Sequence, residues 1–206
     1  MNKIKLNFVN KSSDTSNNSV VIFQKNVAEG AAENAIAWKV IENCGPMENH
    51  PFQYSPDLMV AAGDAYGNYT PQLTGSGGLA FDMVRSTSGE LLEISATAAA
   101  SSTGIEVRNN LDLGAINANC YRDGRLLARE ASLAPGEKAV FEFHPAIYIG
   151  VVSQVEEGDV ISADVISQIN FKISLLGIKS ADIVMTGGGY GTDATAFKFT
   201  LENVRY

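Results

Sequence analysis

The segment 112–129 reads DLGAINANCYRDGRLLAR and predicts the class of fold. Two strand-like runs stand on either side of Asp123-Gly124. An Asp-Gly pair between such runs favours a tight β-hairpin turn, because the two central residues of that turn adopt positive φ angles. The segment therefore predicts two antiparallel strands, and local patterns of the same kind recur through the chain.

Short alternations of apolar and polar residues lie near both ends of the sequence. Residues 3–8, 171–175 and 197–201 alternate with period two, which is typical of strands with one buried face. Apolar and β-branched runs add candidate strands at 20–23, 36–40, 58–62, 79–84, 91–95, 104–108, 140–143, 147–155 and 181–185. Many short strands separated by turns indicate a sandwich or a barrel.

We therefore expect an all-β fold, a single jelly-roll-like β-sandwich domain over residues 1–206 with at most one or two short helices. A helix would fall at 27–37 or 159–168. We expect Trp38 to face the core. The stretch 43–56 is rich in proline and is expected to be an irregular connection, because proline lacks the N–H that strand pairing uses.

The composition excludes some classes of protein. Of the 206 residues 45% are hydrophobic and 18% are charged, which predicts a folded chain rather than a disordered one. The net charge is −8 at pH 7 and the basic residues are scattered, so we expect no nucleic-acid partner. No apolar leader follows Met1, so we expect a cytoplasmic location, or release by a route that needs no signal peptide.

No pattern of residues indicates a catalytic site, a metal site or a cofactor. The only histidines are His50 and His144, and a non-haem iron site would need both of them with an acid such as Asp57 or Glu142. Cys44 and Cys120 form either one disulfide or two buried thiols, and a cytoplasmic location favours the thiols.

The glycine-rich residues 187–191 follow an apolar run, as a phosphate-binding loop does. Such a loop needs a helix N-terminus after it, whereas the residues that follow here are strand-like. We therefore expect a turn between the last two strands at 187–191.

Two tyrosines are the candidate ligand-binding residues. Tyr66 and Tyr69 lie in the turn-rich region 63–78. Tyrosine combines an apolar ring with a polar tip, so such a loop suits a sugar ring or a membrane interface. A tyrosine that simply packs over the edge of a sheet is the other interpretation.

Four stretches carry a resemblance to known proteins: 20–26 (VVIFQKN), 37–41 (AWKVI), 114–124 (GAINANCYRDG) and 180–189 (SADIVMTGGG). Through them the chain resembles a group of functionally unassigned bacterial β-rich proteins. The resemblance covers nearly the whole chain and implies one domain. Some members carry the name aromatic ring-opening dioxygenase, which implies a metal-dependent reaction but transfers no site residue to this sequence.

Three hypotheses of function follow from these observations. The first is a non-enzymatic protein that binds a ligand or assembles with itself, because strand edges pair readily with neighbouring strands. The second is a toxin-like or lectin-like protein that contacts membranes or glycans. The third is a metal-dependent oxygenase.

Overall fold

A computed structural model describes residues 3–14, 18–31 and 33–206, and its fold is all-β. The described residues contain one short α-helix, α1 (Ala163–Gln168), and one 3-10 turn at Gly191–Asp193. The expected fold class with few short helices is therefore confirmed, and α1 lies inside one of the two ranges expected for a helix.

The chain divides into two compact units. Unit 1 contains Met1–Gln24, Ile36–Pro56 and Pro145–Tyr206, and unit 2 contains Lys25–Ala35 and Asp57–His144. Most of unit 2 is therefore inserted into the chain of unit 1 between two prolines. The expectation that the whole chain behaves as one domain stays a prediction.

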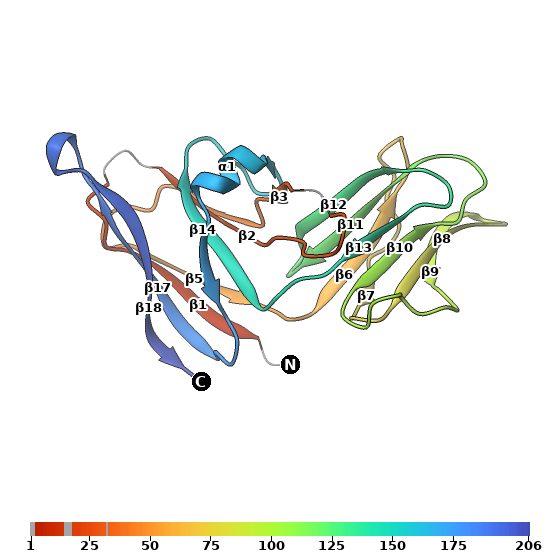
Figure 1. Cartoon of the computed structure of the whole chain (residues 1–206), viewed down its shortest axis with the longest axis horizontal. Helices are drawn as coiled ribbons and strands as arrows, with labels where there is room; N and C mark the ends of the chain where they lie inside the picture. The colour runs from red at the N-terminus through yellow and green to blue at the C-terminus, as the bar shows by residue number, and fades with distance from the viewer. Residues whose placement is uncertain (1–2, 15–17, 32) are drawn as a thin grey trace. The chain divides into compact units, whose positions relative to one another are not determined.

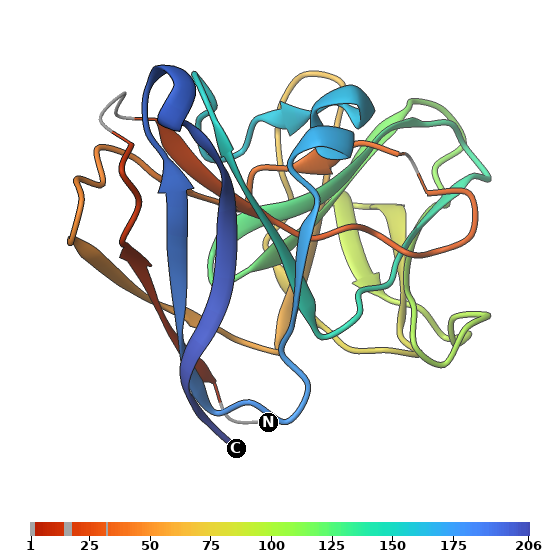
Figure 2. The same ribbon diagram turned by 60° about the vertical axis from the view of Figure 1, so that its left-hand side comes forward.

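Unit 1 contains two four-stranded sheets (Figure 1; Figure 2). The first has the order β18-β17-β1-β5, made of β18 (Thr195–Arg205), β17 (Ser180–Gly188), β1 (Ile4–Asn10) and β5 (Asn49–Tyr54). The second has the order β16-β14-β2-β4, made of β16 (Phe171–Ser174), β14 (Ala146–Val152), β2 (Ser19–Phe23) and β4 (Lys39–Ile41). The rings of Phe171 and Phe199 lie 5.7 Å apart and join the two sheets. The two-residue strands β3 (Ala35–Ile36) and β15 (Val160–Ile161) form a separate two-stranded sheet.

Unit 2 also contains two four-stranded sheets. One has the order β12-β11-β6-β7, made of β12 (Arg125–Leu133), β11 (Ile116–Arg122), β6 (Leu58–Gly63) and β7 (Leu73–Gly75). The other has the order β13-β10-β8-β9, made of β13 (Lys138–Phe141), β10 (Ile105–Asn109), β8 (Ala80–Ser86) and β9 (Gly89–Ile94). Both contribute to one apolar cluster, with Val60 and Ala118 from the first sheet and Phe81, Val107 and Phe141 from the second. Unit 2 is thus a sandwich closed by apolar burial between its sheets.

The two units share a pattern of pairing. Each combines a wholly antiparallel sheet with a sheet whose two central strands are parallel, β1 with β17 in unit 1 and β8 with β10 in unit 2. In unit 1 the parallel pair joins residues near opposite ends of the chain, with Lys5 opposite Ser180. A parallel pair needs a crossover connection, so alternation along the sequence could not predict it.

The expectation that the proline-rich stretch 43–56 is an irregular connection is wrong for part of it. Residues 49–54 of the proline-rich stretch form β5, in which Pro51 lies opposite Asn7. A strand tolerates proline here because β5 is at the edge of its sheet, where the missing N–H can face away from the partner strand. The described residues within 27–34 contain no helix and instead make a turn in which the Ala31 N–H donates to the Ala28 carbonyl.

The single strand expected at 36–40 is also wrong, because β3 ends at Ile36 and β4 begins at Lys39 in a different sheet. Other local expectations are confirmed. Trp38 is buried and packs edge-on against the rings of Phe52 and Tyr54. Asp123 and Gly124 have φ angles of 50° and 76° and connect β11 to β12, as the hairpin signal predicted. The stretch 10–18 is rich in Ser, Asn and Asp, which predicts a loop, and it lies partly outside the described residues, which omit 15–17.

Candidate functional site

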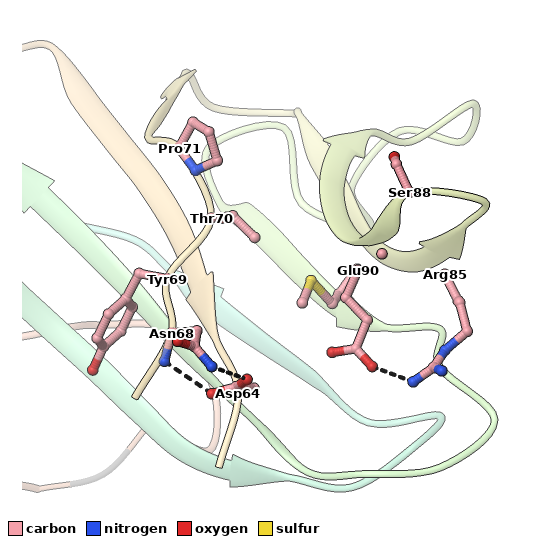
Figure 3. A pocket seen from close by; sticks show the side chains of 10 residues that line it. Asp64, Asn68, Tyr69, Thr70, Pro71, Arg85, Ser88 and Glu90 are labelled. Carbon is pink, nitrogen blue, oxygen red and sulfur yellow. Dashed lines mark hydrogen bonds and ion pairs between the residues drawn. The ribbon is translucent and has the colours of Figure 1, made fainter. Parts of the chain in front are cut away.

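A polar hollow of about 460 Å³ lies in unit 2 (Figure 3). The loop after β6 forms one wall and the hairpin of β8 and β9 forms the other. Its volume falls within the range usual for small-molecule sites. We therefore describe this hollow, the unit-2 pocket, as the candidate binding site.

The loop wall of the unit-2 pocket is held by one carboxylate. Oδ1 of Asp64 accepts hydrogen bonds from the backbone N–H groups of Tyr66 (2.8 Å) and Asn68 (2.9 Å), and Oδ2 accepts one from Nδ2 of Asn68 (2.8 Å). These hydrogen bonds, led by that of the Asn68 side chain, lower the pKa of Asp64. The loop therefore keeps a set shape, and the amide of Asn68 is held in the wall of the pocket.

The hairpin wall carries one positively and one negatively charged side chain. A guanidinium nitrogen of Arg85, on β8, donates to a carboxylate oxygen of Glu90, on β9, and the two residues lie opposite each other in the strand register. The Arg85 side chain is mostly exposed, whereas that of Glu90 is about three-quarters buried. Ser88 lies in the turn between the two strands and also lines the pocket. A donor and an acceptor therefore stand side by side at this wall.

The two tyrosines expected to bind a ligand occupy different places. Tyr66 is 90% exposed, whereas Tyr69 is 49% exposed and lines the pocket. The ring of Tyr69 lies against Gly63, where an added Cβ would come within 2.5 Å of it. In Figure 3 this ring points away from Arg85 and Glu90. The role of both tyrosines as ligand contacts stays a prediction.

Composition and turn chemistry indicate the loop that carries the tyrosines, whereas no motif in the sequence indicates Arg85 and Glu90. Arg85 and Glu90 are separated by four residues that include Ser86, Ser88 and Gly89, which form a hairpin turn. Recognising that turn in the sequence would have predicted that the two charges face each other. The approach of these two side chains to the loop after β6 depends on how the sheets pack, and no local sequence pattern predicts it.

The remaining candidates from the sequence are placed as follows. His50 lies on β5 in unit 1, and His144 is the last residue of unit 2. Cys44 and Cys120 are buried free thiols, so of the two options for them the disulfide is wrong. Burial raises the pKa of Cys120 to about 12. Of the turn expected at 187–191, Gly187 and Gly188 belong to the end of β17, and residues 189–194 connect it to the strand β18, as the strand-like residues after it predicted.

None of the helices in the described part of the chain has the length and apolar character needed to cross a membrane. No known family, curated protein or solved structure matches this chain. The resemblance noted in the sequence therefore stays a prediction, and the function has to be argued from the site.

Proposed function

We propose that this protein is a non-enzymatic binding protein whose unit-2 pocket holds a hydroxyl-rich ligand, such as one sugar residue of a glycan. The observation that supports the proposal is the pairing of Arg85 with Glu90 opposite the Asn68 amide, within a hollow of about 460 Å³. A sugar hydroxyl both donates and accepts, so it can bond to the carboxylate and to the guanidinium at once.

The pocket also offers features that orient a small polar ligand. Pro71 and Met83 add apolar surface to the lining, which suits the C–H face of a sugar ring. The hydrogen bonds of Asp64 hold the loop before any ligand arrives, so little ordering would be needed on binding.

A glycan array followed by calorimetry with the best glycan tests this proposal. We expect Glu90→Gln to weaken binding about 10-fold or more, because a hydrogen bond to a charged group contributes about 1.5–3 kcal/mol. Glu93→Gln is the matched control, since Glu93 is exposed on the same strand as Glu90 and does not line the pocket. Binding that survives Glu90→Gln, or no glycan bound at all, would overturn the proposal. Dye release from glycan-free liposomes would instead favour the toxin-like alternative.

Self-assembly is a second candidate function, and β18 favours it. This strand has eleven residues, about twice the usual length, and lies at the edge of its sheet. Lys198, Thr200 and Glu202 alternate along it and are exposed. If two copies paired antiparallel about Thr200, Lys198 of each would lie opposite Glu202 of the other, which is a stabilising arrangement.

Charge reversal separates this pairing from nonspecific association. Lys198→Glu places like charges across the two-fold axis and should abolish a dimer seen by size exclusion with light scattering. Lys198→Glu combined with Glu202→Lys should restore the dimer. A particle that stays monomeric at every concentration, or a dimer indifferent to both variants, would remove this candidate.

A further inference from the structure

Three side chains with metal-binding atoms meet in unit 1. They are Cys44 and Glu48, in the loop between β4 and β5, and His50, on β5. The thiol sulfur, a carboxylate oxygen and a ring nitrogen all lie within 4.8 Å of one another. Cys44 is buried, His50 is partly buried and Glu48 is exposed, so the cluster is open to solvent on one side.

A tight turn brings Glu48 back toward Cys44. The N–H of Glu48 donates to the carbonyl of Gly45 (3.1 Å), with Pro46 and Met47 between them. Proline at the second position and the positive φ of Met47, 71°, are features of a type II turn. The Glu48 carboxylate then accepts a hydrogen bond from the N–H of Gly45 (3.0 Å).

The buried Asn10, at the end of β1, fastens this loop to the sheet. Its Nδ2 donates to the carbonyl of Cys44 (2.7 Å), and its backbone carbonyl accepts from the N–H of Met47 (2.6 Å). Its own N–H donates to the carbonyl of Glu48 (3.0 Å). The backbone that carries two of the three side chains is therefore held in place, which is what a metal site needs from its scaffold.

The third side chain comes from a paired strand and has an unused polar atom. His50 lies opposite the buried Phe8 in the β1–β5 pair, and Pro51 after it restricts its backbone to extended conformations. Nε2 of His50 is buried and has no hydrogen-bond partner among the described residues. A buried polar nitrogen without a partner is costly, and bonding to a metal ion would satisfy it.

We infer that Cys44, Glu48 and His50 bind a zinc ion, with water at the fourth position. Sulfur, imidazole nitrogen and carboxylate oxygen are the ligands that Zn²⁺ takes in proteins, and three protein ligands with one water is the arrangement of an open zinc site. On binding, the thiol proton passes to solvent and the thiolate bonds to the metal. The hard cations Ca²⁺ and Mg²⁺ prefer oxygen ligands, so we expect neither of them to compete.

Calorimetry of the metal-free full chain with Zn²⁺ tests the site, and Co²⁺ reports its ligands through the thiolate charge-transfer absorption band. We expect one equivalent of Zn²⁺ per chain and a Co²⁺ band in the wild type. Cys44→Ser should remove the band. Cys44→Ser and His50→Gln should each weaken Zn²⁺ binding more than about 100-fold, since even groups that only orient a ligand change metal affinity about 10–100-fold.

Matched controls keep the test decisive. Cys120→Ala and His144→Gln remove the other thiol and the other imidazole, and both should bind Zn²⁺ like the wild type. Glu48→Gln can still accept the hydrogen bond from Gly45, so it tests the carboxylate without disturbing the turn, and should also weaken binding. Failure of the wild type to bind Zn²⁺ would overturn the inference, as would a Co²⁺ band that persists in Cys44→Ser. If Cys44→Ser does not fold, unchanged Zn²⁺ affinity in both His50→Gln and Glu48→Gln would overturn it.

Discussion

Replacing Glu106 with glutamine should cost unit 2 a large part of its free energy of unfolding at neutral pH. Glu106 lies on β10, is 1% exposed and accepts four hydrogen bonds. Oε1 accepts from Nζ of Lys138 (2.7 Å) and from the N–H of Ala100 (2.9 Å), and Oε2 accepts from Nε (2.9 Å) and Nη2 (2.6 Å) of Arg108. Glutamine has nearly the same volume but no charge, so the variant removes the ion pairs while leaving the packing in place.

The magnitude follows from the pKa of Glu106. Burial raises this pKa, but the hydrogen bonds from Lys138, Ala100 and Arg108 and the charge of Lys138 outweigh burial and hold it at about 2, below the ordinary 4.5. That difference corresponds to about 3 kcal/mol in favour of the folded state. Because the pKa is lowered on folding, this contribution is fully present above the ordinary value of 4.5 and is lost as the pH falls toward 2.

Urea unfolding of the wild type and Glu106→Gln at two pH values checks the reasoning. We expect the variant to be less stable by about 3 kcal/mol near pH 7 and by only about 1 kcal/mol near pH 3. At pH 3 the carboxyl of the unfolded wild-type chain is already mostly protonated, whereas the folded one, with a pKa of about 2, is still mostly ionised. Glu90→Gln, which breaks an ion pair whose arginine is mostly exposed, should change the free energy of unfolding by about 1 kcal/mol or less. A difference between wild type and Glu106→Gln that is the same at both pH values would refute the argument.

Three further predictions concern packing, backbone strain and thiol chemistry. Gly150→Ala should lower the free energy of unfolding by about 2–3 kcal/mol, because the added Cβ would lie 2.9 Å from Cα of Ile169. Gly45→Ala is the control and should change the free energy of unfolding little, because its Cβ would have no atom nearer than 3.5 Å. Equal values for the two variants in urea unfolding would contradict this reasoning. Met47→Gly should raise the free energy of unfolding of metal-free protein by about 0.5–1 kcal/mol, because the strain that glycine relieves at this positive φ exceeds the extra backbone entropy that glycine loses on folding. Met47→Ala should give no such gain, because alanine keeps the Cβ that causes the strain. In thiol titration with a disulfide reagent, Cys120 should react only on unfolding, because it is fully buried and its pKa is about 12; rapid reaction of both thiols in the folded protein would disprove this.

Local patterns were enough to predict the class of fold and several individual elements. Asp123-Gly124 joins β11 to β12 with the positive φ angles that the hairpin requires. The alternation near the N-terminus corresponds to β1, and the run 20–23 lies in β2. These predictions succeed because turn geometry and the burial of one strand face depend on residues a few positions apart.

Pro51 shows where local reasoning fails. Proline lacks the N–H that strand pairing uses, so the sequence alone predicts an irregular connection around it. In the folded protein β5 lies beside β1 at the edge of a sheet, where a proline can be accommodated. Whether a strand is at the edge or the centre depends on its neighbours in space, which no window of sequence contains.

The candidate sites also show the difference between what local sequence indicates and what the tertiary structure decides. The chemistry and turn-rich surroundings of Tyr66 and Tyr69 are visible in the sequence, whereas Asn68, Arg85 and Glu90 face one hollow only because the loop after β6 and the β8–β9 hairpin converge. Cys44 and His50 are close in sequence, yet their atoms meet through the turn before β5 and the hydrogen bonds of the distant Asn10.

The sequence by itself determined that the chain forms short strands joined by tight turns, because alternation and turn residues act over a few positions. Only the tertiary structure decided that β1 pairs in parallel with β17, that most of unit 2 is inserted within unit 1, and which polar side chains share a site. Pairing between distant segments depends on the burial of whole sheet faces, and the free energy of that burial cannot be predicted from any single stretch of residues.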